Sequence, residues 1–271
     1  MTVRVAVIGV TGRMGRAIVR AADESNEVDV VAGVASGKSA ELGRDIGELA
    51  GVAPYGFSVS SDVKAAVSQC DVAIDFSNGA ATAAHIAACR EARKPLVIGT
   101  TGFGADVEEA VTRAVGEIAV LIAPNTSIGV TLLVELVREA ARTLPTKDFD
   151  IAISETHHRH KKDAPSGTAL ALGRAAAEGR GEPSPRANSI IGATPRDADA
   201  PGIHFAVTRA GDIVGEHSVL FAGAGEQVVL SHRATDRSIF ARGALQAAAW
   251  LAAARPGRYA MRDVVGYKTV G

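Results

Sequence analysis

The chain has 271 residues, enough for one large domain or two modest ones with a sizeable core. Its 29 Lys and Arg residues nearly balance its 30 Asp and Glu residues, and only 4% of its residues are aromatic. A general nucleic-acid binder, which needs a basic surface or stacking side chains, is therefore disfavoured. Cys70 and Cys89 match no disulfide or CxxC pattern, and no signal peptide or membrane-spanning stretch is recognisable. We expect a cytoplasmic protein without a membrane partner.

The first half of the chain alternates between short β-branched runs and stretches with helical spacing. Helices are predicted at residues 13–23 and 80–91, and strands at residues 3–8, 28–34, 72–74, 95–98 and 118–122. Continuous apolar strands separated by helices are typical of a parallel sheet that is covered on both faces. The pattern predicts an α/β fold with a Rossmann-like nucleotide-binding domain.

The pattern changes after Asn125. Helices are predicted at residues 130–142, about 168–178 and 241–254, and strands at residues 149–153, 204–209, 216–221 and 227–232. Residues 179–202 carry four of the ten prolines and are interpreted as an exposed loop or linker. These elements indicate a second α+β domain with an antiparallel or mixed sheet.

A glycine-rich turn follows the first predicted strand and opens the first predicted helix. Its sequence, GVTGRMG at residues 9–15, has GxxGxxG spacing instead of the commoner GxGxxG. A backbone that approaches a pyrophosphate needs residues without Cβ, and the next helix offers free N–H groups at its N-terminus. A tight turn that uses glycine only for packing gives the same pattern, but the strand–turn–helix context favours a dinucleotide site.

The acidic residue that commonly binds the ribose 2′-OH, about 20 residues further on, is missing. Ser36 and Lys38 stand there instead. Without a carboxylate nothing repels a 2′-phosphate, and Lys38 or Arg13 can attract one. We therefore hypothesise a preference for NADPH over NADH; the alternative is that Lys38 is an ordinary solvated loop lysine.

Two further loops follow later strands, GTTGF at residues 99–103 and APNTS at residues 123–127. In open α/β sheets, ligands bind outside the carboxyl ends of the strands. Thr101 and Asn125 can supply hydrogen bonds there, so we expect these loops to hold a nicotinamide ring and its ribose. Either loop alone would also fit a simple turn.

The segment ETHHRHKKDAPSGT at residues 155–168 contains three of the seven histidines. His157, His158 and His160 could ligate a metal, but no nearby Cys or HExxH pattern completes a zinc set. The run is also short for nucleic-acid binding, and an ordinary solvated loop is a third alternative. We favour an anion-binding acid–base site, because adjacent cations bind carboxylates and lower the pKa of a neighbouring lysine or histidine.

The same segment then opens a helix. Ser166 can cap this helix, and the first N–H groups, those of Gly167 and Thr168, can hold a second carboxylate. The segment thus offers both a proton donor and a carboxylate cradle, which suits a small dicarboxylate.

The pattern ExHHxxKxDxPSGTA at residues 155–169 resembles the signature of the 4-hydroxy-tetrahydrodipicolinate (dihydrodipicolinate) reductase family. The resemblance continues through GRMG at 12–15, DF at 75–76, GTTGF at 99–103, PNxSxG at 124–129, RAGDIVGEH at 209–217 and MRD at 261–263. It implies an enzyme of the diaminopimelate route to lysine, which uses NADPH or NADH to reduce a small cyclic dicarboxylate with loss of water. No metal is expected.

The resemblance also implies roles for single residues. His157 would be the proton donor and acceptor and Lys161 a proton donor; the sequence does not decide which delivers the decisive proton. The expected substrate-binding residues, including the expected cap, are His158, Ser166, Gly167, Thr168 and the more weakly matched Arg237. The resemblance implies cofactor-binding residues in three loops, and the turn after the second strand adds two more. The complete expected set is Gly9, Val10, Thr11, Gly12, Arg13, Met14, Ser36, Lys38, Gly99, Thr100, Thr101, Ala123, Pro124, Asn125 and Thr126.

By the same resemblance, residues 1–127 and 238–271 would form the dinucleotide-binding domain, because the final helix would return to its sheet. Residues 128–237 would bind substrate and build a homotetramer through the second sheet. Two other functions compete with this interpretation. One is a different nicotinamide reductase, such as an aldehyde or semialdehyde reductase, whose phosphorylating type would need a thiol nucleophile in a strand-end loop. The other is a non-enzymatic nucleotide sensor, which would need neither His157 nor Lys161.

Overall fold

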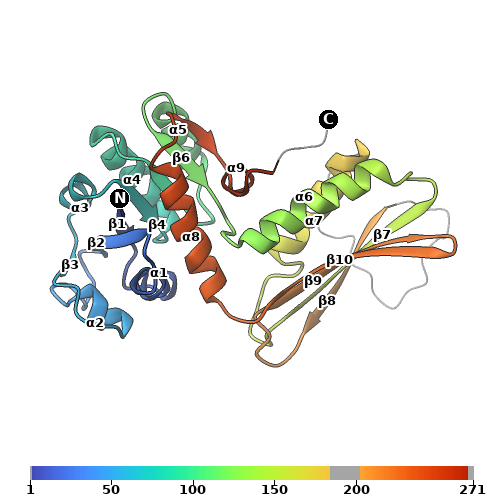
Figure 1. Cartoon of the computed structure of the whole chain (residues 1–271), viewed down its shortest axis with the longest axis horizontal. Coiled ribbons are helices and arrows are strands. Elements are labelled where there is room, and N and C mark those ends of the chain that lie inside the picture. The colour runs from blue at the N-terminus through green and yellow to red at the C-terminus, as the bar shows by residue number, and fades with distance from the viewer. Residues whose placement is uncertain (1, 184–201, 268–271) are drawn as a thin grey trace. The chain divides into compact units, whose positions relative to one another are not determined.

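The computed structural model describes residues 2–183 and 202–267 (Figure 1). The described residues form two compact units. The first contains the chain up to Ile128 together with Ser238–Gly266, and the second contains the described part of Gly129–Arg237.

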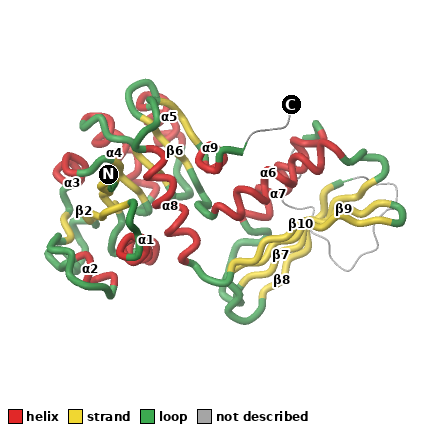
Figure 2. Tube along the Cα trace, in the orientation of Figure 1, coloured by secondary structure: helices red, strands yellow, loops and turns green. Residues whose placement is uncertain are grey.

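The first unit is built on a parallel sheet of seven strands in the order β11-β6-β5-β4-β1-β2-β3. The strands are β1 (Val3–Ile8), β2 (Val28–Val34), β3 (Val59–Ser60), β4 (Val72–Asp75), β5 (Leu96–Ile98), β6 (Ala119–Ile122) and β11 (Gly257–Tyr259). The helices are α1 (Arg13–Asp23), α2 (Ile46–Ala50), α3 (Val63–Gln69), α4 (Gly79–Glu91), α5 (Ala105–Ala114), α8 (Ser238–Leu251) and α9 (Met261–Val265). Figure 2 shows these helices around the strands. The expected Rossmann-like parallel sheet is confirmed.

Both faces of this sheet are buried, and β1 shows how one strand serves two layers. Val5 and Val7 belong to a core cluster shared with α1 and α8. Ala6 and Ile8 belong to a second cluster shared with α3, α4 and α5. Successive side chains of a strand point to opposite faces, so an apolar run without alternation is what a doubly covered strand requires.

Helix α8 comes from the far end of the sequence and lies beside α1, as the red and blue ribbons in Figure 1 show. Gly243 allows α8 to lie close to the end of β6, because a Cβ there would lie 1.7 Å from the carbonyl oxygen of Thr126. The Thr126 hydroxyl donates to the carbonyl oxygen of Phe240 at 2.6 Å. The last long helix therefore completes the first sheet's covering layer.

Several short elements of the first unit were not predicted from the sequence: α2, α3, α5, α9, β3 and β11. Two of them are single-turn helices whose apolar spacing is too brief to identify. Helix α2 instead depends on a side-chain cap, since Asp45 accepts the N–H groups of Gly47 and Glu48 at 2.7 and 3.1 Å.

The second unit contains a mixed sheet in the order β10-β9-β7-β8, in which β7 and β8 run parallel and the other pairs are antiparallel. Its strands are β7 (Phe149–His157), β8 (Ile203–Arg209), β9 (Gly215–Gly223) and β10 (Glu226–Ala234), and its helices are α6 (Ile128–Thr143) and α7 (Gly167–Arg180). The apolar side chains of α6 and α7 form one core with alternate residues of β7, β8 and β9. The expected mixed sheet is confirmed.

Most predicted boundaries in the second unit were wrong by one or two residues, and the helix expected at residues 241–254 lies instead at Ser238–Leu251 in the first unit. The largest difference in the second unit is at the end of its first strand. The strand expected to end at residue 153 continues to His157, and the helix expected to end near residue 178 continues to Arg180. The strand was cut short because its buried positions change there from isoleucine to Glu155 and His157, which interrupts the apolar alternation. Of the proline-rich segment expected as a loop, residues 184–201 lie outside the described residues.

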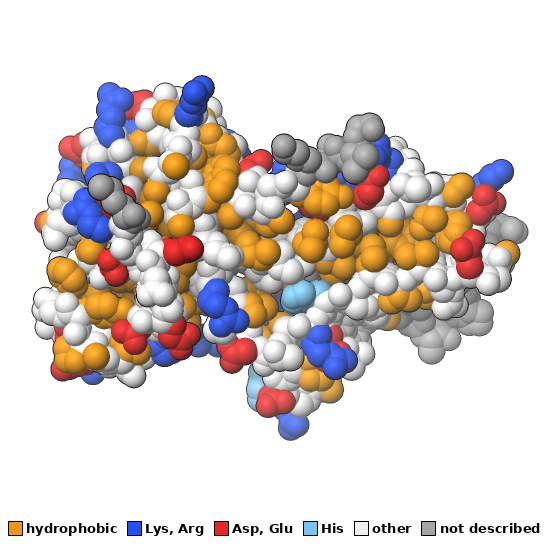
Figure 3. All heavy atoms as spheres, in the orientation of Figure 1, with side chains coloured by type: hydrophobic (Ala, Val, Ile, Leu, Met, Phe, Trp, Pro, Cys, Tyr) orange, Lys and Arg blue, Asp and Glu red, His pale blue; other side chains and the backbone are white. Residues whose placement is uncertain are grey.

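No helix among the described residues is long and apolar enough to cross a bilayer. On the face in view in Figure 3, basic and acidic side chains are interspersed over the first unit. This distribution agrees with the near-zero formal charge.

Candidate active site

One candidate site lies in the first unit, where the order of the parallel strands reverses. β1 has β4 on one side and β2 on the other, and the crossovers from these strands leave in opposite directions. The loops that follow β1, β4, β5 and β6 therefore open at the carboxyl edge of one sheet. In doubly wound sheets, this edge is where a dinucleotide binds.

The glycine turn is shaped by close backbone packing. Gly9 has φ +86°, a left-handed value, and a Cβ on it would lie 2.5 Å from the carbonyl oxygen of Phe76. A Cβ on Gly15 would lie 2.3 Å from the carbonyl oxygen of Gly9, so the first turn of α1 packs directly on the loop. Gly12 is the N-cap of α1, and no side chain of the described residues caps this helix. The N–H groups in the first turn of α1 can therefore bind an anion such as a pyrophosphate.

Ser36 and Lys38 lie exposed in the turn after β2, where the Ser36 hydroxyl accepts the N–H of Lys38 at 3.3 Å. Arg13 is also exposed, at the start of α1. A carboxylate that sequence reasoning missed lies nearby: Glu41 pairs with Arg44 at 2.5 Å and with Arg16 at 3.4 Å. Two arginines share this single carboxylate, so the surroundings of the turn remain basic.

Arg16 links this basic turn to the glycine loop. Its Nε atom donates to the carbonyl oxygen of Thr11 at 3.0 Å, while its Nη2 atom contacts Glu41. Neither arginine nor Glu41 belongs to a spacing pattern that would have revealed this contact from the sequence.

The two later loops are anchored by buried threonines. Thr100 and Thr126 are buried, whereas Thr101 and Pro124 are exposed. The Asn125 side chain accepts the N–H of Ser127 at 2.9 Å, which fixes the turn after β6. Because these loops follow β5 and β6, they lie at the same carboxyl edge of the sheet as the glycine turn.

Another candidate site lies at the carboxyl end of β7 in the second unit. His157 is the last residue of β7 and is 7% exposed. Its Nδ1 atom forms an ion-pair contact with the carboxylate of Glu155, which is 2% exposed and lies two residues earlier on the same face of the strand. Gly215, the first residue of β9, lies beside the His157 ring. A Cβ on Gly215 would be 3.0 Å from His157 Nε2.

Glu155 is held by two further structural elements. Arg209 Nη2, at the end of β8, donates to Glu155 Oε1 at 3.0 Å, and the N–H of Ser166 donates to the same oxygen at 2.9 Å. Burial alone would raise the pKa of Glu155, but the interactions with His157, Arg209 and Ser166 outweigh it and lower the pKa to about 2. The carboxylate is therefore charged at any working pH.

Ser166 connects this carboxylate to the start of α7. Its hydroxyl caps the helix by accepting the N–H of Ala169 at 3.1 Å, as the sequence suggested, and it lies 3.1 Å from Nε2 of His217. The rings of His157 and His217 meet edge to face at 5.0 Å. Burial, followed by the charge of His157, lowers the pKa of His217 to about 4, so this side chain is neutral near pH 7.

The loop after β7 carries the remaining cations. Lys161 Nζ contacts Asp163 at 2.9 Å, and its side chain is 22% exposed. His158 is half-buried; desolvation, followed by the charge of Arg237, lowers its pKa. Arg209 fastens this loop by donating to the carbonyl oxygens of Asp163 at 2.5 Å and Lys161 at 3.3 Å. His157, His158, Lys161 and Arg237 thus belong to one basic region of the second unit.

Sequence reasoning missed Glu155, Arg209 and His217 as site residues, although all three lie in the segments that carried the resemblance. Glu155, His157 and His217 place three possible ligand atoms within 4.8 Å of one another. The donor set suits an acid–base site better than a metal, because Arg209 and the Ser166 N–H already occupy one oxygen of the single carboxylate.

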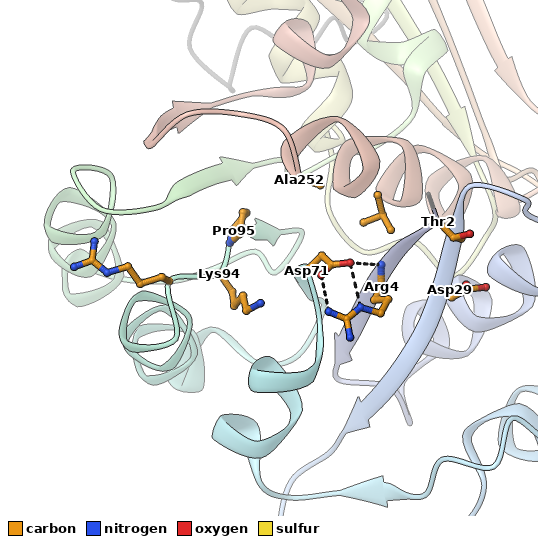
Figure 4. A pocket seen from close by; sticks show the side chains of 9 residues that line it. Thr2, Arg4, Asp29, Asp71, Lys94, Pro95 and Ala252 are labelled. Carbon is orange, nitrogen blue, oxygen red and sulfur yellow. Dashed lines mark hydrogen bonds and ion pairs between the residues drawn. The ribbon is translucent and has the colours of Figure 1, made fainter.

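A hollow of about 850 Å³ lies at the opposite, amino-terminal edge of the first sheet (Figure 4). Arg4 and Asp71 pair with each other there at 2.8 Å, and Lys94 and Asp29 also line it. It contains none of the predicted site residues, and it lies away from the carboxyl ends of the strands, where ligands of such sheets bind.

The two cysteines have no exposed sulfur that could attack a substrate. Cys70 and Cys89 are both 0% exposed, and burial raises the pKa of both thiols. Because a nucleophilic cysteine acts as an accessible thiolate, this arrangement argues against the thiol-dependent semialdehyde reductase.

Family profiles match nearly the whole chain: "Dihydrodipicolinate reductase, N-terminus" matches residues 3–126 and "Dihydrodipicolinate reductase, C-terminus" matches residues 129–265. The chain belongs to the dihydrodipicolinate reductase family. A 4-hydroxy-tetrahydrodipicolinate reductase of Alkalilimnicola ehrlichii is 47% identical to it over 268 residues, which cover 98% of this chain and 100% of that protein. The reductase of Halorhodospira halophila is 46% identical with the same coverage.

Among solved structures, a dipicolinate-bound dihydrodipicolinate reductase from Paenisporosarcina sp. TG-14 is similar with a TM-score of 0.77 and 26% identity, covering 96% of this chain and 98% of that one. An amine dehydrogenase from Mycobacterium smegmatis has a TM-score of 0.67 at 15% identity, covering 95% and 94%, and shares the fold alone. The expected family, fold class and oxidoreductase activity are therefore confirmed.

Proposed function

We propose that this reductase reduces 4-hydroxy-tetrahydrodipicolinate to tetrahydrodipicolinate with NADPH or NADH, in the diaminopimelate route to lysine. One hydride and one proton enter the ring system, and one water leaves. The observation that carries this proposal is the cluster of His157, Glu155, Arg209 and Ser166 at the carboxyl end of β7, within the segment that bears the family's signature.

The first unit would hold the dinucleotide, which supplies a hydride when bound. The N–H groups at the start of α1 would bind its pyrophosphate, and the glycines there let the backbone approach it. Gly99, Thr101 and Asn125, in the loops after β5 and β6, would contact the nicotinamide end. The remaining residues of the predicted cofactor set lie in these same three loops and in the turn after β2.

The second unit would hold the substrate and manage the proton. His157 and Lys161 would supply the proton that quenches the electron density left by hydride addition. Glu155 fixes the His157 ring through its Nδ1 atom, which leaves Nε2 for proton exchange. Since Arg209 holds both Glu155 and the loop that carries Lys161, one guanidinium positions both proposed donors.

Two carboxylates of the substrate need two cradles. Gly167, an exposed residue, and the neighbouring Thr168 begin α7, whose dipole favours an anion. His158 and Arg237 would bind the other carboxylate from the basic region of the second unit. The similar reductase from Paenisporosarcina sp. TG-14 has dipicolinate bound, a ring with two carboxylates, and this ligand supports the proposed substrate class.

We further propose that NADPH is preferred. Ser36 offers a hydroxyl and Lys38 a cation after β2, and the carboxylate of Glu41 nearby is neutralised by Arg16 and Arg44. A 2′-phosphate would therefore meet a basic turn.

The second sheet would also form the contact between copies of this chain in a homotetramer. Its helix-free face carries small side chains in register, with Ser218 opposite both Ser154 and Ser231. Val229 on the edge strand β10 is 54% exposed, an apolar side chain that a partner copy would cover. We place the enzyme in a reducing cytoplasm, in keeping with the free, buried Cys70 and Cys89.

A coupled assay tests the reaction. The substrate is generated enzymatically in the cuvette, the loss of reduced-nicotinamide absorbance is followed with each cofactor, and the product is identified by mass spectrometry. We expect substrate-dependent oxidation of NADPH and formation of tetrahydrodipicolinate. Cofactor binding without any such turnover would instead support a nucleotide sensor and overturn the proposal.

A further inference from the structure

Asp75, the last residue of β4, is a buried carboxylate that none of the steps above uses. It is 0% exposed, and its Oδ2 atom lies 2.9 Å from Nδ1 of His85, a buried residue of α4. Its Oδ1 atom accepts the N–H of Ser77 at 2.8 Å and the Ser77 hydroxyl at 2.5 Å. The hydroxyl of Thr100, in the loop after β5, lies 3.1 Å from the same oxygen. The carboxylate thus joins its own turn, helix α4 and a predicted cofactor loop.

The turn held by Asp75 forms a wall for two of the proposed cofactor loops. Its next residue, Phe76, donates its N–H to the carbonyl oxygen of Ile8 at 3.0 Å. On one side, Gly9 leaves no room for a Cβ against the Phe76 carbonyl. On the other side, a Cβ on Gly99 would lie 2.1 Å from the Phe76 ring. A shift of this turn would therefore displace the glycine loop and the loop after β5 together.

The network has the properties of a rigid support. Burial alone would raise the pKa of Asp75, but the hydrogen bonds from His85 and Ser77 outweigh it and hold the pKa below its usual value. A charged acceptor surrounded by directed donors fixes its neighbours more narrowly than apolar contacts do. Functional loops need such support to reach productive geometry.

We propose that Asp75 and His85 form a positioning pair for the dinucleotide site. They hold Phe76 in place, and both the glycine turn and the loop after β5 pack against Phe76. The inference rests on the proposed function only in that the carboxyl edge of the first sheet binds NADPH or NADH. His85 contacts Asp75 and is itself buried, so it acts through the loops.

Titration of the full-length protein with NADPH, without substrate, tests the pair. His85→Ala removes the contact, whereas His85→Asn places an amide donor where the imidazole Nδ1 lies. Cys89→Ala, one turn further along α4, is the matched control because it truncates another buried side chain of the same helix, one that is not among the hydrogen-bond partners of Asp75 described above. Dipicolinate binding, measured by calorimetry, reports separately on the second unit, and the thermal midpoint reports on folding.

We expect His85→Ala to raise the Kd for NADPH by about ten- to a hundredfold, the penalty typical of misplaced binding groups. Dipicolinate affinity should stay within about twofold, His85→Asn should recover most of the NADPH affinity, and Cys89→Ala should leave it near the wild-type value. An unchanged NADPH Kd in a folded His85→Ala protein would overturn the inference, as would equal losses in His85→Ala and Cys89→Ala.

A milder variant covers the case in which His85→Ala does not fold. Ser77→Ala removes one hydroxyl from the same carboxylate and should raise the NADPH Kd in the same direction by a smaller factor. If Ser77→Ala left this Kd unchanged and His85→Ala could not be isolated, the pair would have a structural role alone and the inference would fail. A wild-type protein that bound no NADPH would contradict the proposed function instead, so the two failures are distinguishable.

Discussion

Arg209 donates to the carboxylate of Glu155 at 3.0 Å from the end of the neighbouring parallel strand. The same guanidinium donates to the carbonyl oxygen of Asp163 at 2.5 Å, and the other Glu155 oxygen contacts His157. One buried ion pair therefore holds the strand that carries the proposed catalytic histidine together with the loop that carries Lys161.

Replacing Glu155 by glutamine should destabilise the protein by about 3 kcal/mol, because it leaves a largely buried guanidinium without its charge partner. Glu216→Gln is a suitable control: Glu216 pairs with Arg233 at 2.9 Å, but both side chains are solvent-exposed. An exposed pair of this kind contributes at most about 1 kcal/mol. Denaturant unfolding measures the loss of unfolding free energy in both variants. Equal losses would show that the Glu155–Arg209 pair contributes no more to stability than an exposed pair.

Removing either proposed proton donor should slow turnover. We expect His157→Ala and Lys161→Ala each to lower kcat by roughly two orders of magnitude, the usual contribution of a positioned general acid. The coupled assay at saturating cofactor measures kcat, and NADPH titration checks that the first unit still binds. His160→Ala, on the same loop and exposed, is the control. Near-normal turnover in both donor variants would refute the assigned roles.

We expect Gly215 to be needed for turnover because it leaves space for the His157 ring. Gly215→Ala would place a Cβ 3.0 Å from His157 Nε2 and 3.2 Å from His157 Cδ2, so the ring must shift by a few tenths of an ångström. We expect kcat to fall by about tenfold or more with little change in NADPH affinity. Gly116→Ala is the control, because a Cβ there meets nothing within 4 Å. Wild-type kcat in Gly215→Ala would show that the His157 ring tolerates displacement.

His217 should make stability depend on pH. Its folded pKa of about 4 lies below the ordinary value of 6.5, so between these values the unfolded chain binds a proton that the folded protein does not. Its contribution, on the order of 3 kcal/mol, is complete above pH 6.5 and is lost as the pH falls toward 4. His217→Gln, which keeps a polar group near Ser166, should flatten this decline in unfolding curves measured at several pH values. An equally steep decline in the variant would assign the effect to other groups.

Cofactor preference should depend on the turn after β2. Lys38→Ala should lower kcat/KM for NADPH by about tenfold and leave that for NADH nearly unchanged, because only the 2′-phosphate would contact the lysine. Ser36→Asp should add repulsion and shift the preference toward NADH. Parallel assays with both cofactors measure the ratio. A higher kcat/KM of the wild-type enzyme with NADH than with NADPH would contradict the proposed preference.

Much of the fold could be predicted because the elements that build the sheets have a simple burial pattern. The strands β1 and β2 and the helix α1 were predicted with the bounds that the structure shows, since each presents a largely apolar run or a clear helical face. The strand β7 was cut short because Glu155 and His157 occupy its buried face. Polar residues at buried positions are what a functional site requires, so the pattern failed where the site begins.

The site was only partly predictable for a related reason. His157, Lys161 and Ser166 lie close together in sequence, and a local motif could reveal them. Arg209 and His217 reach Glu155 through the register of β8 and β9, which the sequence does not state. Glu41 is linked to the glycine turn through the side chain of Arg16. Pairings between distant segments therefore account for most of what was missed.

The late position of α8 has a consequence for biosynthesis. Ala241, Ala244, Leu245 and Leu251 supply part of the core of the sheet whose first strand begins at Val3. On the ribosome, the first unit therefore cannot complete its core until α8 has been made, after the strands and helices of the second unit. Until then, the face of the sheet that α8 will cover is exposed. A nascent chain arrested at Arg237 should consequently bind chaperones that recognise apolar surface, although most of its sequence has been made.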